Sequence, residues 1–234
     1  MRFDACARTY DDHASPQHAF AALVAGFIRA DPGASILELG AGTGALTHHL
    51  VRTMGAKVQA TDGSRAMVER GSQKVPEAKW AVLEAFAARL PASDLQASSG
   101  LLQWAVDPVS VLRLWGTALT PAGRMVHAFP CLPCLEEWRS LVPEGPVHWR
   151  DEAAWRQVFA SAGLSVKRAQ VWTLRPRFPS ALNLVRAMHL SGVTGQVRLG
   201  PGRLRQAIRS YDQRFRQAQG VYATWVWMAV EATV

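Results

Sequence analysis

Apolar runs and glycine-rich turns follow one another in a fixed order near the start of the chain. Ser35–Leu39 is a short apolar run that ends in glycines, as a buried strand does, and Ala45–Met54 follows with helical spacing and Gly55 as its cap. The same order of strand, helix and strand is then repeated over Lys57–Thr61, Ser64–Gly71 and Lys79–Leu83. This alternation predicts an α/β fold with a parallel, doubly wound sheet.

The rest of the chain adds further elements to this sheet. Helical spacing predicts helices over Ala19–Ala30, Val109–Ala118 and Asp151–Ala162. Strands are predicted over Gly123–Phe129, which follows a turn at Thr120–Ala122, and over Leu164–Leu174 and Tyr222–Val230. The glycine- and proline-rich stretch Arg175–Gln219 is too long for a plain crossover, so we expect a helical cap there, over the ligand edge of the sheet. We expect one domain over 1–234, with a helical lid over 1–30 and the cap over about 175–219.

Composition supports one globular domain. Of 234 residues, 49% are hydrophobic and 19% are charged, which allows a sizeable core. No apolar run reaches the roughly 18 residues that a membrane span needs, and the first residues do not resemble a secretion signal. Cys6, Cys131 and Cys134 are too few and too unevenly placed for a disulfide framework. We therefore expect a cytoplasmic protein without a membrane partner.

The chain is strongly basic, with a formal charge of +8 and a pI near 10.1. Such a charge attracts an acidic macromolecule at long range, either RNA or an acidic protein. The alternative is that the charge reflects a general preference for arginine over lysine and no binding partner. The chain has only four lysines, Lys57, Lys74, Lys79 and Lys167.

The glycine turn after the first strand carries the clearest chemistry. Gly40, Ala41, Gly42 and Gly44 open a helix, and Asp62 ends the next strand, eighteen residues after Gly44. Glycines permit a tight turn and a close approach of the backbone to a ligand, and a carboxylate at this place can accept hydrogen bonds from ribose hydroxyls. The adenosine part of a cofactor would fit.

The spacing of the glycines distinguishes between cofactors. Dinucleotide-binding loops place glycines at the first, third and sixth positions, whereas Gly40, Gly42 and Gly44 alternate and follow Glu38. An acid there would repel a pyrophosphate but can accept hydrogen bonds from the cationic methionine end of S-adenosylmethionine. We favour that cofactor over a dinucleotide and over a glycine turn without a ligand.

Several neighbours complete the expected cofactor site. Glu84 and Ala85 follow the third strand, where they would meet the adenine, unless Glu84 is only an exposed strand end. Gly63 and Met67 lie beside Asp62 in the sequence and are expected to contribute as well.

On these residues the chain resembles the class I S-adenosylmethionine-dependent methyltransferases, and more narrowly the malonyl-acyl-carrier-protein O-methyltransferases of the biotin pathway. The segments similar to that family are Thr9–Gln17, Ser98–Trp104, Leu132–Trp138 and Arg186–Gly195. Ala5, Glu38 and Ser99 depart from the family pattern. The resemblance implies a Rossmann-like, mostly parallel seven-stranded sheet with the cap before its last strand.

The resemblance also implies a reaction: methyl transfer to the free carboxylate of a malonyl thioester on acyl carrier protein, in biotin precursor synthesis, with S-adenosylhomocysteine as product. An ionised carboxylate and a sulfonium need neither a general base nor a metal, so we look for positioning groups. Tyr10 would orient the acceptor, unless it is a packing residue. Arg186 and His189 would bind the carboxylate or the phosphate of the carrier's arm, unless they belong to a solvated face. Gln17 and Ser98 would contact the cofactor.

An acidic carrier protein would also account for a group of basic residues late in the chain, namely Arg198, Arg203, Arg205, Arg209, Arg214 and Arg216. Cys131 and Cys134 have the spacing of half a zinc or redox site, but a second pair is missing. Trp225 and Trp227 alternate with apolar neighbours, which indicates strand residues in the core rather than base stacking.

Two other functions stay open. The chain could methylate another small molecule or RNA, although it lacks the Asn-Pro-Pro-Tyr segment with which amino-methylating enzymes hold a nucleobase. It could also be a non-catalytic relative that binds the cofactor without turnover.

Overall fold

The computed structural model describes residues 4, 6–30, 33–87, 89–194 and 199–234, so Ala5, Gly195 and Arg198 lie outside the described residues. The helices before the fifth strand are α2 (Tyr10–His13), α3 (Ser15–Phe27), α4 (Ala45–Met54), α5 (Arg65–Lys74), η1 (Leu102–Trp104) and α6 (Pro108–Gly116). Those after it are α7 (Glu136–Arg139), α8 (Glu152–Ser161), α9 (Ala181–Leu190) and α10 (Pro201–Phe215). The longer strands are β1 (Ser35–Leu39), β2 (Lys57–Asp62), β3 (Lys79–Val82), β4 (Ser93–Ser99), β5 (Leu119–Pro130), β6 (Ser165–Leu174) and β10 (Trp225–Thr233).

These seven strands form one sheet in the order β3-β2-β1-β4-β5-β10-β6. β1, β2, β3, β4 and β5 run parallel, and β10 is antiparallel to both β5 and β6. The predicted, mostly parallel seven-stranded sheet is thereby confirmed. Because β1 and β4 are neighbours but are not consecutive in sequence, their carboxyl ends diverge into connections on opposite sides and leave a crevice for a ligand.

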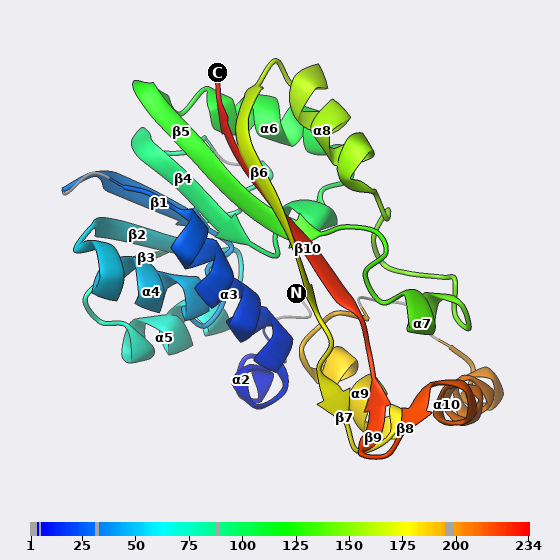
Figure 1. Ribbon diagram of the computed structural model, residues 1–234. Coiled ribbons are helices and arrows are strands. Elements are labelled where there is room, and N and C mark those ends of the chain that lie inside the picture. The colour runs from blue at the N-terminus through cyan, green and yellow to red at the C-terminus, as the bar shows by residue number, and fades with distance from the viewer. Residues whose placement is uncertain (1–3, 5, 31–32, 88, 195–198) are drawn as a thin grey trace.

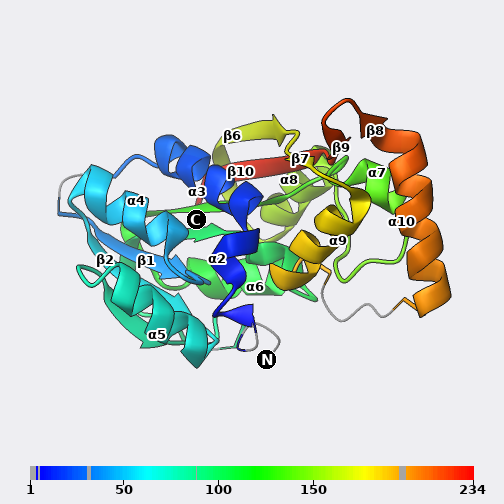
Figure 2. The same cartoon turned by 90° about the horizontal axis from the view of Figure 1, so that it is seen from below.

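Helices cover both faces of the sheet. Figure 1 shows α3 and α4 in front of the strands and α6 and α8 behind them, and Figure 2 shows the same layers from below. Strand β10 lies inside the sheet, and its side chains are buried on both faces from Trp225 to Val230. Trp225 and Trp227 are 4% and 3% exposed, which confirms them as core residues of a strand.

Most predicted elements lie where the sequence placed them, with shifted ends. The strand Ser35–Leu39 and the helix Ala45–Met54 are confirmed at both ends. Helix α3 begins before the predicted Ala19 and ends at Phe27. The predicted turn Thr120–Ala122 lies inside β5. The pairing of β5 with β4 is irregular there, because Ser93 pairs with Leu119 but Leu95, two residues later, pairs with Arg124. A bulge of this kind produces the same proline and glycine signal as a turn between elements.

Residues 175–219 contain α9 and α10 together with two short strands. β7 (Arg177–Phe178) and β8 (Arg216–Gln217) pair with β9 (Gly220–Tyr222) in a second sheet of order β7-β9-β8. The sequence did not predict these strands, because two or three residues carry no readable period. Figure 1 shows this part at the lower ends of β6 and β10, on the side of the molecule where α2 lies. In the described residues, we find no helix with the length and apolar character that crossing a bilayer requires.

Candidate functional site

The glycine turn joins β1 to α4 with an open backbone. Gly40, Gly42 and Gly44 have φ values of 65°, 56° and 93°, in the left-handed region that side chains disfavour. At Gly42, no heavy atom lies within 4 Å of the place where a Cβ would stand. The main chain is therefore open at Gly42, whereas a side chain at Gly40 or Gly44 would crowd Leu101 or Trp80.

Asp62 ties this turn to the end of β2. One carboxylate oxygen, Oδ2, accepts a hydrogen bond from the Gly42 N–H at 2.9 Å, and Oδ1 accepts one from the Ser64 N–H at 2.8 Å. Burial raises the pKa of Asp62, although both N–H groups act in the opposite direction. Each oxygen keeps a lone pair for a further donor. The side chain thus holds the turn and can still bind a ligand hydroxyl.

A cavity of about 290 Å³, which we call the glycine-loop cavity, lies over these residues. Tyr10, Asp62 and Glu84 supply its polar groups. Its apolar and main-chain wall is formed by Gly40, Gly42, Gly63, Met67, Leu83, Ala85, Phe86, Leu101 and Trp104, together with Ser99 and Gly100. An apolar slot for adenine, a carboxylate for ribose hydroxyls and an open glycine turn fit S-adenosylmethionine.

Other residues expected to bind the cofactor lie outside the lining of this cavity. Ala41 and Gly44 are buried within the glycine turn, and Gln17 lines a neighbouring cavity. Glu38 is 1% exposed, and its Oε2 atom has no hydrogen-bond partner. Burial raises the pKa of Glu38 to about 8, so this side chain is mostly protonated at neutral pH.

Ser98 is fully buried and belongs to a pair beneath the site. Its Oγ atom lies 2.9 Å from Nδ1 of His127 on the adjacent strand β5. Burial lowers the pKa of His127 to about 3, so the imidazole is neutral, and its ring lies 4.7 Å from that of Trp115. The Trp115 indole N–H donates to the Ala85 carbonyl at 2.8 Å. These buried groups hold the backbone beside Glu84, where adenine would bind.

The N-terminal segment is fastened to the site through Asp11. Its Oδ1 atom accepts a hydrogen bond from the Thr43 hydroxyl at 2.6 Å, and its Oδ2 atom pairs with Lys74 Nζ at 2.5 Å. Arg70 and His18 lie at 3.4 and 3.3 Å from its oxygens. Burial raises the pKa of Asp11, but the hydrogen bonds from Lys74 and Thr43 outweigh it and lower the pKa. Asp11 thus holds α2 against both the glycine turn and α5.

We expect the substitution Asp11→Ala to weaken binding of S-adenosylmethionine about threefold to tenfold, because partly exposed ion pairs and one hydrogen bond together contribute on the order of 1 kcal/mol. Calorimetric titration of the cofactor measures the change. Asp12→Ala is the matched control, because Asp12 is the exposed neighbour on the same helix. Equal dissociation constants for the two variants would show that the fastening of α2 has no part in binding.

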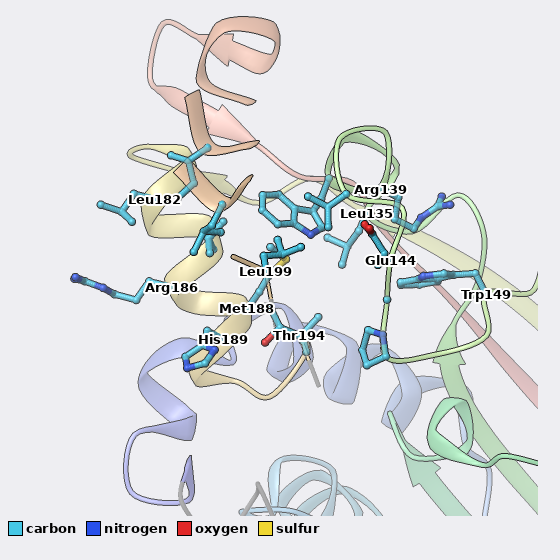
Figure 3. A pocket seen from close by; sticks show the side chains of 18 residues that line it. Leu135, Arg139, Glu144, Trp149, Leu182, Arg186, Met188, His189, Thr194 and Leu199 are labelled. Atoms are coloured by element: carbon cyan, nitrogen blue, oxygen red, sulfur yellow. The ribbon is translucent and has the colours of Figure 1, made fainter. Parts of the chain in front are cut away.

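Two further cavities continue from the glycine-loop cavity. The inner cavity, of about 80 Å³, shares Tyr10, Ser99, Gly100 and Trp104 with it. The outer cavity, of about 380 Å³, shares Leu135, Trp149 and Val193 with the inner one and lies between α7, α9 and α10. Figure 3 shows Met188 and Leu199 in its interior and Trp149 at its edge. Three neighbouring cavities with shared wall residues therefore lie between α10 and the glycine turn.

Tyr10 lies where the glycine-loop cavity and the inner cavity meet. Burial raises the pKa of its hydroxyl, and the nearby carboxylates of Asp62 and Asp11 act in the same direction. The hydroxyl therefore stays protonated and can donate a hydrogen bond. Sequence reasoning placed Tyr10 at the acceptor, and the structure brings it to the boundary between the two cavities.

Arg186 and His189 lie on α9 and line the outer cavity, away from the glycine turn. Both side chains are exposed, and Figure 3 shows Arg186 directed away from the cavity. Helix α9 contacts α2, the helix of Tyr10, but neither Arg186 nor His189 lines the inner cavity or the glycine-loop cavity.

Several lining residues had no assigned role in the sequence. Trp104 lines two cavities, and its segment had been matched to a family pattern without a role. Trp149 lies in the connection between α7 and α8, where no periodicity identifies it. His127 lines none of the three cavities. Its sequence signal, a titratable residue inside an apolar strand, could have been noticed.

The cysteines Cys131 and Cys134 are free thiols and are buried. Burial raises the pKa of Cys131 to about 11 and that of Cys134 to about 12. Both are therefore protonated at neutral pH and poor nucleophiles.

Comparisons with known proteins agree with this geometry. The family model described as a methyltransferase domain matches residues 12–169. The chain is 30% identical over 241 residues to malonyl-[acyl-carrier protein] O-methyltransferase of Hahella chejuensis, covering 95% of this chain and 85% of that protein. Among solved structures, the YcgJ protein from Bacillus subtilis covers 92% of this chain, with 97% of its own length matched, 15% identity and a TM-score of 0.70. Geranyl diphosphate methyltransferase in complex with SAM covers 91%, with 84% of its own length matched, 17% identity and a TM-score of 0.57.

Proposed function

The chain belongs to the methyltransferase-domain family of class I S-adenosylmethionine-dependent methyltransferases, and from this premise we propose that it methylates the free carboxylate of a malonyl thioester on acyl carrier protein, in biotin precursor synthesis. The observation that carries the proposal is the line of three cavities. The acceptor group must pass the outer cavity and enter a space of about 80 Å³. A small group at the end of a long, thin arm can do so.

In this proposal Asp62 binds the ribose hydroxyls, and Met67, Ala85 and Phe86 enclose the adenine. Gln17, which lines the inner cavity, would act on the methionine part directly or through water. When bound, S-adenosylmethionine would supply an electrophilic methyl group to the acceptor carboxylate. The neutral Tyr10 hydroxyl donates to the acceptor and orients it, and the cavity walls exclude water.

The proposed partner is an acidic acyl carrier protein, bound beside the outer cavity. α10 presents the exposed side chains of Arg203, Arg205, Arg209 and Arg214, and Arg216 follows it. Within the described residues, Arg203 pairs with Glu144 and Arg216 with Asp212, whereas the other three form no ion pair. Arg186 and His189, at the rim, would meet the phosphate of the carrier's arm. The three free thiols suit a reducing compartment, so a cytoplasmic location is part of the proposal.

The test uses purified protein, S-adenosylmethionine with a labelled methyl group and malonyl-loaded acyl carrier protein. We expect a base-labile methyl ester on the carrier. A variant with Arg205→Glu and Arg209→Glu should lose about tenfold in kcat/KM with the carrier and nothing with S-malonyl-N-acetylcysteamine, which lacks the protein surface. If neither malonyl acceptor is labelled, the proposed acceptor is wrong. Labelling of bulk RNA instead would favour the nucleic-acid alternative, and cofactor binding without any transfer would indicate a non-catalytic relative.

A further inference from the structure

Several residues that line the inner cavity carry a buried polar atom without a hydrogen-bond partner. Among the described residues, five such atoms belong to side chains that line it. These atoms are Gln17 Oε1, Gln103 Oε1, Trp149 Nε1, Trp225 Nε1 and Trp227 Nε1. They come from α3, η1, the connection before α8, and β10, so parts of the chain that are far apart in sequence contribute to one small space.

A buried N–H group without a partner costs free energy, and native proteins keep few of them. Trp225 and Trp227 are 4% and 3% exposed, so bulk water does not pair with their indole nitrogens. Their side chains lie on the same face of β10, since residues two apart in a strand point the same way. Phe20 stacks on Trp227 at 4.7 Å and fixes the plane of its ring. The two donors are held in place without a protein acceptor.

The chemistry of the lining selects a ligand. An indole N–H only donates, so its partner must be an acceptor atom, such as a carboxylate or carbonyl oxygen. Lys, Arg and His are absent from the described residues that line the inner cavity. The space of about 80 Å³ is less than a third of the 290 Å³ of the glycine-loop cavity, so it suits a small group. A carboxylate group on a short carbon chain meets the conditions of size and acceptor chemistry, with the neutral indole N–H groups as its donors.

We propose that the inner cavity is the acceptor subsite and that the indole N–H groups of Trp225 and Trp227, with Trp149 at its outer edge, bind the oxygens of the acceptor carboxylate. The inference takes the identity of the reaction from the proposed function.

Neutral donors suit this reaction better than a cation does. The carboxylate loses its negative charge as the ester forms, so an Arg or Lys partner would stabilise the ground state more than the transition state. An uncharged donor loses less of its interaction energy as that negative charge disappears. The ester that results is also a weaker acceptor, which favours its release.

The test observes the N–H groups directly. The protein, labelled with ¹⁵N in its nine tryptophans and saturated with S-adenosylhomocysteine, is titrated with S-malonyl-N-acetylcysteamine. We expect the indole N–H signals of Trp225 and Trp227, assigned with W225F and W227F, to move downfield. The signal of Trp155 should stay in place, because its Nε1 is also buried without a partner but does not line the inner cavity. S-acetyl-N-acetylcysteamine, which lacks the carboxylate, should move none of them.

Kinetics supply the second measurement. W225F and W227F should each raise the KM for the malonyl acceptor about tenfold and leave the dissociation constant of S-adenosylmethionine within twofold, while W155F changes neither. Two results would overturn this inference and leave the proposed function standing. One is methyl transfer by the unaltered protein while the Trp225 and Trp227 signals do not move. The other is equal shifts of these signals with the acetyl compound. Clear shifts without transfer to any malonyl acceptor would support the carboxylate subsite and overturn the proposed reaction.

Discussion

The substitution Asp62→Ala is expected to weaken binding of S-adenosylmethionine by one to two orders of magnitude, or about 1–3 kcal/mol. The carboxylate accepts hydrogen bonds from the Gly42 and Ser64 N–H groups at 2.9 and 2.8 Å, and each oxygen keeps a lone pair for a ribose hydroxyl. Removing it takes the ligand's acceptor away and leaves two backbone donors unpaired beside the adenosine. Calorimetric titration of the cofactor measures the effect.

Asp94→Ala is the matched control for this variant. Asp94 also accepts hydrogen bonds from a backbone N–H and two hydroxyls, those of Ser35 and Thr120, but it lies at the first residues of β4, at the opposite edge of the sheet. This variant should bind the cofactor as the unaltered protein does. Comparable losses in both variants would mean that the effect comes from general destabilisation and not from a cofactor contact.

The substitution Glu38→Gln is expected to stabilise the protein above neutral pH. Burial raises the pKa of Glu38 to about 8 from an ordinary value of 4.5, so the folded chain holds a proton that the unfolded chain releases between these values. The contribution of Glu38 to stability is therefore fully present below about pH 4.5 and is lost as pH rises through about 8. The loss amounts to about 3–5 kcal/mol.

Because Gln cannot ionise, the E38Q variant should be more stable than the unaltered protein at pH 9, and the difference should shrink toward pH 5. Urea unfolding followed by tryptophan fluorescence at pH 5, 7 and 9 measures the free energy of unfolding. Glu84→Gln is the control, because Glu84 is exposed. A difference between E38Q and the unaltered protein that does not vary with pH would rule out a buried, protonated Glu38.

The two Trp residues of β10 show where local reasoning ends. Their alternation with apolar neighbours predicts buried strand residues, and the structure confirms burial. The same pattern does not reveal that their indole nitrogens lack hydrogen-bond partners. That depends on which residues surround them, and the neighbours in the cavity wall, among them Gln17, Gln103 and Trp149, come from other parts of the chain.

Arg186 and Tyr10 also show that a local sequence pattern does not fix where a candidate site residue lies. Both were expected near the acceptor, but Tyr10 lies at the boundary of the glycine-loop and inner cavities, whereas Arg186 lies on the exposed rim of the outer one. Residue type alone suited both to bind an acceptor. Their places are set by how α9 packs on α2, α10 and β7, which no local pattern encodes.

By itself the sequence determined the α/β fold and the glycine turn after the first strand. These features depend on periodicity and on backbone conformations that few residue types adopt, so neighbouring residues suffice to specify them. Only the tertiary structure decided the burial of Glu38, the fastening of α2 by Asp11 and the set of tryptophan donors around the inner cavity. Desolvation and hydrogen-bond partnership depend on which distant segments meet in space, and packing settles that for the whole chain at once.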